Sequence, residues 1–311
     1  MNRGHTYRER LPASAAGSTL VDWLTRTYEH STAAEWRERI DQGLVRVDET
    51  TTHADVRLRP GQRLEWFRPP WEEPDVPLHY DVVHEDDDLL VVDKPAGLPT
   101  MPAGGFLEHT LLALVRQRDA KWSAVHRLGR GTSGLVVFAA PHAAAATHAL
   151  FRERRIEKRY LARVTGTLTP QTITAPIGRV PHPRMRELFA VTPGGAAAET
   201  IVERVDKDLA TVRIVTGRPH QIRIHLAHVG CPLKDDPLYG AHGVLLDATP
   251  GDCGYFLRAF ELVLPTLRIT AAIDSTATRS AAAARPSLRT EPPAPSASSA
   301  SARPAPGAPE P

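Results

Sequence analysis

The sequence has few cysteines, few lysines and no long apolar run. Its two cysteines, Cys231 and Cys253, lie far apart, which excludes a disulfide framework and a Cys-x-x-Cys motif. No apolar stretch approaches the roughly 20 residues of a membrane-spanning helix. The polar start of the chain also lacks the apolar segment of a secretory signal. The sequence therefore predicts a cytoplasmic protein that has no membrane partner.

The net charge is close to zero, because 38 basic residues stand against 36 acidic ones. Net charge alone thus gives no indication of nucleic-acid binding, and any basic surface must be local. Five of the basic residues are lysines and 33 are arginines. Arginine suits phosphate recognition, but a bias in codon composition explains the same skew more simply.

The first 77 residues are predicted to hold a small module between two less regular segments. Residues 1–17 are predicted to be a flexible arm, and residues 69–77 a proline-rich linker. Between them, residues 18–68 show two short helical patterns followed by two short strands. The second helix is marked by a capping box at its start and by Gly43 at its end.

Residues 18–68 resemble the S-four-like RNA-binding module found in a ribosomal protein and in many RNA-modifying enzymes. The stretches that carry the resemblance are 39–48 and 58–64. The resemblance implies that arginines of the module, Arg39 and Arg46 among them, face RNA phosphate. An ordinary solvated basic surface is the alternative.

Residues 78–270 are predicted to form the second and larger domain. Strand patterns alternate there with helical ones, beginning with two apolar strands joined by an acidic turn at 85–88. From residue 271 the chain consists almost entirely of Ala, Ser, Pro and Arg. Residues 271–311 are therefore predicted to be a disordered tail, because they offer nothing to bury against the entropy of ordering.

The most informative stretch is the loop at 126–134, which reads His-Arg-Leu-Gly-Arg-Gly-Thr-Ser-Gly and opens into an apolar strand. Its three glycines imply backbone conformations that other residues avoid, or close approach to another group. Thr132 and Ser133 are expected to bond to the loop's own backbone. A well-punctuated loop without further function is the alternative for the loop alone.

Three histidines near one predicted helix invite a metal interpretation. His225 lies three residues from His228 and five from His220, and no cysteine or carboxylate completes a set at ligand spacing. The sequence therefore predicts no metal site.

Further short motifs accompany the loop in a fixed order. They are Asp93 to Gly97, the loop itself, Lys158 to Ala162, Thr216 to His225, and Asp236 to Gly240. Together they resemble the RluA-type family of RNA pseudouridine synthases over roughly residues 78–265. The resemblance implies an α+β pseudouridine-synthase fold, in which helices flank a central mixed, mostly antiparallel sheet.

The resemblance also implies the reaction, in which uridine in RNA is isomerised to pseudouridine. The glycosidic bond is broken, the uracil turns, and it is rejoined to the sugar through carbon. No cofactor or metal is implied, and the partner would be structured RNA, either ribosomal or transfer RNA. The sequence names neither the RNA nor the uridine, and a monomer is the default expectation.

Site residues follow from matching the family's motifs. Arg223 matches the arginine that pairs with the catalytic aspartate. Tyr160 matches the aromatic platform for a flipped uracil, although a core aromatic is the usual fate of a strand tyrosine. The positions expected to face RNA, or to support the site structurally, are Arg127, Arg130, Lys158 and His220.

One position departs from the family, because Gly129 stands where the catalytic aspartate belongs. Gly131 likewise replaces a common second acidic residue, and glycine can act neither as nucleophile nor as base. One hypothesis is that another carboxylate enters the pocket and reaches Arg223; the candidates are Asp93, Asp235 and Asp236. The alternative is a catalytically silent RNA-binding homologue that acts as a folding or assembly factor. No phosphate-binding loop or nucleophile motif supports a third, unrelated function.

Overall fold

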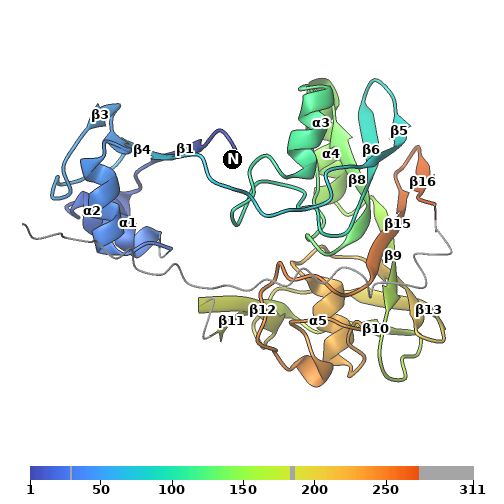
Figure 1. Cartoon of the computed structure of the whole chain (residues 1–311). Coiled ribbons are helices and arrows are strands. Elements are labelled where there is room, and N and C mark those ends of the chain that lie inside the picture. The colour runs from blue at the N-terminus through green and yellow to red at the C-terminus, as the bar shows by residue number, and fades with distance from the viewer. Residues whose placement is uncertain (29, 183–185, 273–311) are drawn as a thin grey trace, which may run out of the picture.

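The computed structural model describes residues 1–28, 30–182 and 186–272, with the side chain of Arg186 left out. Within them the strands form a four-stranded sheet, a ten-stranded sheet and a separate two-stranded hairpin. Figure 1 shows the four-stranded sheet and its two helices standing to one side of the rest. The predicted tail lies outside the described residues from 273 onward. Among the described helices, none is long and apolar enough to span a bilayer.

The N-terminal module packs two helices against one face of its sheet. The sheet order is β1-β4-β2-β3, and all pairs are antiparallel. Its strands and helices are β1 (His5–Arg10), η1 (Ala13–Ala15), α1 (Leu20–Thr27), α2 (Ala33–Asp41), β2 (Val45–Val47), β3 (Thr50–Thr51) and β4 (Arg63–Arg68).

The prediction of a flexible arm at 1–17 is wrong. Residues 5–10 form β1 and pair with β4 in register from His5–Arg68 to Arg10–Arg63. Leu11 and Ala15 are buried in the core of the module. The arm has too few apolar residues to show a strand pattern, and its order comes from long-range pairing with β4.

The second helix begins and ends as predicted. The Thr32 hydroxyl accepts the Glu35 N–H at 3.3 Å, and the Glu35 carboxylate accepts the Thr32 N–H at 2.6 Å. Gly43 follows the helix with φ of 73°. Trp36 and Ile40 are buried beneath it.

The large sheet has the order β10-β13-β14-β9-β15-β8-β6-β5, with β16 beside β15 and β7 beside β8. Only β8 and β15 pair in parallel among these strands, so the predicted mixed, mostly antiparallel sheet is confirmed. The strands are β5 (Asp81–Glu85), β6 (Leu89–Lys94), β7 (Ser123–Ala124), β8 (Ser133–Ala139), β9 (Glu157–Arg163), β10 (Gln171–Ile173), β13 (Thr200–Asp206), β14 (Leu209–Ile214), β15 (Leu257–Val263) and β16 (Arg268–Thr270). The separate hairpin is β11 (Ile177–His182) and β12 (Arg186–Val191).

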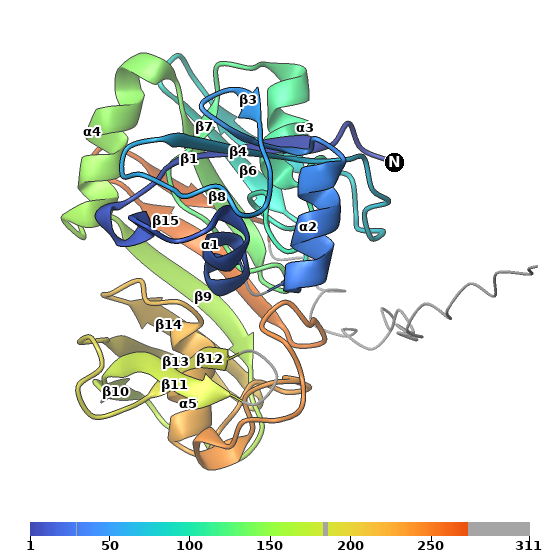
Figure 2. The same cartoon turned by 90° about the vertical axis from the view of Figure 1, so that its left-hand side faces the viewer.

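Helices cover both faces of the sheet, which is why β6 and β8 read as continuous apolar runs. Leu90 and Val92 of β6 share one core with α3 (Leu111–Arg118). Val91, between them, belongs to a second core with α4 (Pro141–Arg152). Figures 1 and 2 show this half above, α5 and the β10–β13 region below, and β9 and β15 running between them.

The helix α5 (Gln221–His228) is buried on all sides and not amphipathic, since every residue from 221 to 227 is buried. It is followed by η2 (Ala241–Gly243). Gly230 lies beyond its end with φ of 82°. Before the helix begins, His220 adopts a left-handed conformation with φ of 54°.

The segment between β4 and β5 has no helix or strand, yet it is anchored at Glu73. The Glu73 carboxylate accepts the backbone N–H groups of residues 107, 108 and 109 at 2.7–3.0 Å, and the Asn2 side-chain amide at 2.8 Å. Burial alone would raise the pKa of Glu73, but these donors lower it to about 2. One carboxylate thus joins the N-terminus, the linker and the second domain.

Replacing the anchor should destabilise the protein in a pH-dependent way. Glu73→Gln removes the charge that four donors stabilise, so we expect a loss of about 2 kcal/mol in the free energy of unfolding at pH 7. Because the folded pKa is lowered from 4.5 to about 2, the contribution is complete above about pH 5 and disappears as the pH falls toward 2. Urea unfolding at pH 7 and pH 3 measures the difference. The exposed neighbour provides the control, Glu72→Gln, and equal midpoints for both variants at pH 7 would contradict the anchor.

Candidate active site

The loop at 126–134 is held from behind by Lys94. This side chain is fully buried and donates from Nζ to the carbonyls of Pro95, Leu98 and Arg130 at 2.9, 2.7 and 3.2 Å. Burial lowers the pKa of Lys94 to about 7. The Gly97 N–H also donates to the Arg130 carbonyl at 2.8 Å. The motif at 93–97 therefore serves to fix the loop.

His126 fixes the start of the loop. Its Nε2 accepts the Val137 N–H at 3.0 Å, so the ring is neutral with its proton on Nδ1. Burial, and secondarily the charge of Lys158, lowers the pKa of His126 to about 3. The ring stacks on Phe151 with centroids 4.6 Å apart.

The three glycines of the loop differ in how much room each position leaves for a side chain. A Cβ on Gly134 would lie 2.1 Å from the Ala259 carbonyl oxygen, where β8 and β15 approach closely. A Cβ on Gly131 would lie 2.9 Å from Cζ and Oη of Tyr255. A Cβ on Gly129 would meet nothing closer than the Thr132 hydroxyl at 3.7 Å and the Tyr255 hydroxyl at 4.0 Å. Sterics thus demand glycine at 134 and 131 but not at 129.

Arg223 and Asp236 form a buried bidentate ion pair. Arg223 Nε and Nη2 each donate to an Asp236 oxygen at 2.7 Å, and the two side chains are 3% and 1% exposed. Burial works to lower the pKa of Arg223, but these bonds outweigh it and raise the pKa. Asp236 Oδ1 also accepts the N–H groups of Leu238 and Tyr239 at 2.9 and 3.0 Å. The carboxylate is therefore fully engaged.

Two tyrosine rings enclose the Arg223 guanidinium. Its carbon lies 4.3 Å from the Tyr255 ring centre and 4.9 Å from that of Tyr239. The Tyr239 hydroxyl donates to the Phe189 carbonyl at 3.0 Å, so it accepts from His220 Nδ1 at 2.9 Å. Burial, followed by the charge of Arg223, lowers the pKa of His220 to about 4. His220 is thus neutral at pH 7 and keeps Nε2 as an acceptor.

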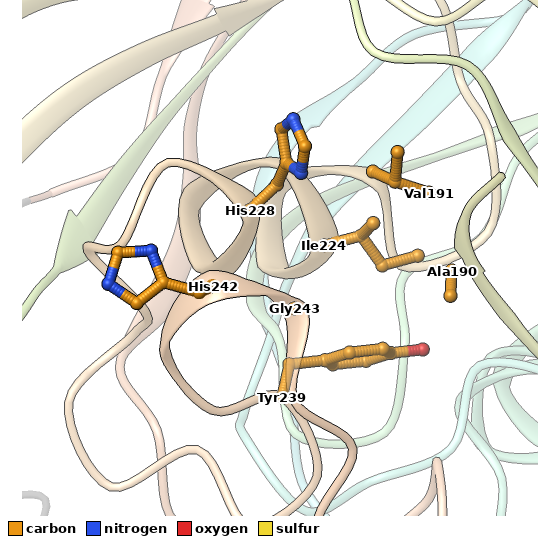
Figure 3. Close-up of a pocket in the computed structure, with 7 residues that line it drawn as sticks. All are labelled: Ala190, Val191, Ile224, His228, Tyr239, His242 and Gly243. Atoms are coloured by element: carbon orange, nitrogen blue, oxygen red, sulfur yellow. The ribbon is translucent and has the colours of Figure 1, made fainter. Parts of the chain in front are cut away.

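Tyr239 also lines a cavity of about 230 Å³ behind the ion pair (Figure 3). The cavity's other lining residues are Ala190, Val191, Ile224, His228, His242 and Gly243. In Figure 3 His228 rises from its helix, and His242 lies on the opposite side of the ring of Tyr239 from Ala190. No residue of the loop at 126–134 lines this cavity, so it is separate from the candidate active site.

Of the three proposed substitute carboxylates, the structure brings only Asp236 to Arg223. Asp93 belongs to the α4 face of β6, because neighbouring strand residues alternate and Lys94 faces the loop. It is paired with Arg258, whose Nη1 lies 3.1 Å from Oδ1. The hypothesis that Asp93 reaches Arg223 is therefore wrong. Asp235 is exposed, with φ of 60°, and its carboxylate does not contact Arg223.

The remaining family positions gather around the loop. Tyr160 is buried in the core that also holds Tyr255, opposite Ala259 in the sheet. Lys158 is half-buried, with Nζ 3.8 Å from the Cβ position of Gly217. Arg127 is exposed. Arg130 donates from Nε to the Gly251 carbonyl at 2.6 Å and lies over the Phe106 ring.

Arg39 and Arg46 do not share one surface of the N-terminal module. Arg39 extends from α2, stacks over Trp36 and Trp66 at 4.8 and 5.5 Å, and donates to Ser31 at 2.7 Å. Arg46 lies between two buried valines of β2 and is exposed on the face of the sheet away from the helices. Only one of the two can lie on a given face against RNA.

The sequence did not reveal the role of residues 249–255. This segment precedes β15, which starts at Leu257, and lies beside the loop. There the Thr132 side chain interacts with Tyr255, and the Ser133 hydroxyl donates to the Leu257 carbonyl at 3.5 Å. Both hydroxyls therefore tie the loop to this segment and not to its own backbone. No local pattern signals a contact over more than 100 residues.

Across residues 1–28, 30–182 and 186–272, no three His, Cys, Asp or Glu side chains gather as metal ligands would. His225 bonds to Thr200 at 2.9 Å and to the Ala175 carbonyl at 2.8 Å, which occupies both of its ring nitrogens.

Comparison with known proteins gives a consistent picture. A family described as RNA pseudouridylate synthase matches residues 88–228. An uncharacterised RNA pseudouridine synthase of Synechocystis sp. is 37% identical over 83% of this chain and 93% of that protein. RNA pseudouridine synthase 5 of Oryza sativa subsp. japonica is 37% identical over 85% of this chain and 84% of that protein. Ribosomal large subunit pseudouridine synthase D of Xanthomonas campestris is 36% identical over 74% of this chain and 73% of that protein.

Solved structures agree on the fold. The structure of human RNA pseudouridylate synthase domain containing 1 matches with a TM-score of 0.52 and 25% identity, over 65% of this chain and 86% of that one. Human RNA pseudouridylate synthase domain containing 4 matches with a TM-score of 0.50 and 20% identity, over 64% of this chain and 90% of that one.

Breaking the buried ion pair should be costly. Asp236→Asn leaves the Arg223 charge buried without its partner, so we expect a loss of about 3–5 kcal/mol in the free energy of unfolding. Chemical denaturation at pH 7 measures it. The neighbouring exposed carboxylate gives the matched control, Asp235→Asn, for which we expect a change below about 0.5 kcal/mol. Similar values for both variants would rule out a dominant role for the pair.

The two loop glycines should respond differently to a methyl group. Gly131→Ala forces the new Cβ against the Tyr255 ring, so we expect a loss of about 1–3 kcal/mol. Gly129→Ala meets only ordinary contacts, and we expect it to change stability by less than about 0.5 kcal/mol. Thermal and urea unfolding of the two variants measure the difference. If Gly129→Ala proves the more damaging change, the described packing of Tyr255 on the loop is incorrect.

Proposed function

This chain belongs to the RluA-type family of RNA pseudouridine synthases, and we propose that it isomerises specific uridines in RNA to pseudouridine. In this reaction the C1′–N1 bond breaks and a C1′–C5 bond forms, while the C5 proton is lost and N1 gains one. Substrate and product are isomers, so the reaction consumes no cofactor.

The observation that carries the proposal is the set of contacts that joins several family motifs around the loop at 126–134. Lys94 binds the Arg130 carbonyl, and Gly129 and Gly131 lie against Tyr255. Tyr255 stacks on Arg223, which binds Asp236. These segments are distant in sequence, and packing them together does not by itself require so many polar side chains. Their meeting supports a retained active site.

RNA would enter along the arginines of the loop. Arg127 is exposed and can contact phosphate. Arg130 uses Nε to bind the Gly251 carbonyl, so its two terminal nitrogens remain available as donors to phosphate. A uridine would have to leave its stack to reach Gly129. Tyr160, buried in the core that also holds Tyr255, would supply an aromatic contact to a flipped base, and the neutral His220 a polar one.

We infer a wider RNA contact from the N-terminal module, whose two helices and sheet suit an S-four-like module. Glu73 would hold this module at a fixed place beside the second domain. Ribosomal and transfer RNA are both suitable partners. A monomeric, metal-independent enzyme in the cytoplasm remains our expectation.

One observation favours a second function, namely RNA binding without catalysis. Gly129 supplies no carboxylate, and Asp236 already neutralises Arg223 and accepts four hydrogen bonds, three at Oδ1 and one at Oδ2. A site of this kind could bind a flipped uridine without isomerising it. The chain would then act as an RNA folding or assembly factor.

Mapping pseudouridine tests the proposed function directly. Carbodiimide-based mapping of RNA from cells that lack the gene should show one or more lost sites. Adding the purified chain to that RNA should restore them without metal or cofactor. If no site is lost and none is restored, the isomerase function is excluded.

A carboxylate introduced at Gly129 separates the two functions. The position has room for a side chain, and Gly129→Asp should fold normally. We expect an active wild type, and a variant whose rate stays within about threefold of it, because Arg223 is already neutralised by Asp236. A silent wild type that becomes active in Gly129→Asp would instead establish the binding function. Gly129→Asn is the uncharged control.

A further inference from the structure

We propose that the Tyr255 hydroxyl, which borders the position of the missing loop carboxylate, donates a hydrogen bond to a carbonyl oxygen of the target uracil. This inference rests on the proposed function, because it names a catalytic residue for the same reaction. It is carried by the position of Tyr255, by the groups that hold it, and by the state of the nearby carboxylates.

The position of Tyr255 is the first argument. Its hydroxyl oxygen lies 4.0 Å from where the Cβ of an aspartate at position 129 would stand. The same oxygen lies 2.9 Å from the Cβ position of Gly131, where the family often has its second acidic residue. A carboxylate at either position would extend into the space that the phenol borders. Both departures from the family motif therefore occur beside one side chain.

The support around Tyr255 is the second argument. One ring face lies on the Arg223 guanidinium at 4.3 Å, and the ring edge lies against Gly131. The segment that carries it is held by Arg130, which donates to the Gly251 carbonyl at 2.6 Å. A group held by rigid contacts keeps its orientation without cost at the moment of reaction.

The hydroxyl also has a proton to give. Burial raises the pKa of Tyr255, so the phenol is neutral at pH 7 and acts as a donor. The Thr132 side chain works to lower the pKa of Tyr255, as a donor to the phenol oxygen does. A phenol oxygen that accepts in this way keeps its own proton for a further acceptor.

A hydrogen-bond donor beside Gly129 would face the uracil oxygens, which gain negative charge during the reaction. When the C1′–N1 bond breaks, its electron pair passes to the uracil, whose carbonyl oxygens gain negative charge. A preorganised neutral donor stabilises that charge. When C5 bonds to the electron-poor C1′, the uracil uses this electron pair for the new bond; C5 then loses its proton, N1 takes one up, and the phenol keeps its own proton throughout. Tyr255 thus needs no additional reactant.

The nearby carboxylates are poorly placed for this role. Asp236 is 1% exposed and accepts four hydrogen bonds. Asp93 is paired with Arg258 on the other face of the sheet. Asp235 is exposed and turned outward in a left-handed turn, with only its backbone carbonyl near Gly254. The hydroxyls of Thr132 and Tyr255 are therefore the polar groups that border position 129, at 3.7 and 4.0 Å from its Cβ position.

The test is single-turnover pseudouridine formation by full-length Tyr255→Phe, on RNA from the deletion strain at the sites that wild type modifies. We expect the rate to fall about 100-fold, as for loss of one donor to a developing oxyanion. RNA affinity, measured by filter binding, should stay within about twofold, and the melting temperature should be nearly unchanged. Tyr80→Phe, which removes a phenol that interacts with Arg118, is the matched control and should keep the wild-type rate.

A second variant guards against a folding defect. Thr132→Val leaves the phenol in place but removes the partner that orients it, and we expect a loss of about tenfold in rate with unchanged RNA affinity. If Tyr255→Phe and Thr132→Val both stay within about threefold of an active wild type, the role of Tyr255 is refuted and the isomerase function stands. If wild type and Tyr80→Phe form no pseudouridine on any RNA, the role of Tyr255 and the isomerase function are both refuted.

Discussion

The buried pair of Arg223 and Asp236 is the interaction on which the active-site region depends. A guanidinium inside a protein requires a counter-ion with matching geometry, and the bidentate contacts at 2.7 Å supply it. The same carboxylate accepts two backbone N–H groups and so fixes the turn at 236–239. Through its two stacked tyrosines, Arg223 connects this turn to the segment at 249–255. The charge that would face an aspartate in the family is thus satisfied from a different part of the chain.

The glycine loop is shaped by its neighbours on both sides. Lys94 holds it from behind through a carbonyl contact, and Tyr255 covers it at Gly131. These contacts explain how the loop keeps its form with glycine at both 129 and 131. They also explain why position 129 remains open, with room for a side chain or for part of a substrate.

The connection between the two parts of the chain also depends on one buried carboxylate. Glu73 gathers donors from the N-terminus and from residues 107–109, so a segment rich in proline becomes a fixed joint. Trp71 adds a bond from its indole nitrogen to the Gly105 carbonyl at 2.6 Å. A module held in this way keeps a fixed place beside the second domain.

The sequence by itself determined most of the elements and the family. Apolar runs and apolar alternation located several strands of the large sheet, the capping box located α2, and the ordered motifs identified the chemistry. These signals are local, because periodicity and caps depend on neighbours a few residues away. Only the tertiary structure decided that residues 5–10 form a strand, that Asp236 and not Asp93 neutralises Arg223, and that Tyr255 borders Gly129. Each of these depends on contacts between segments distant in sequence, and such contacts produce no periodic pattern in the sequence.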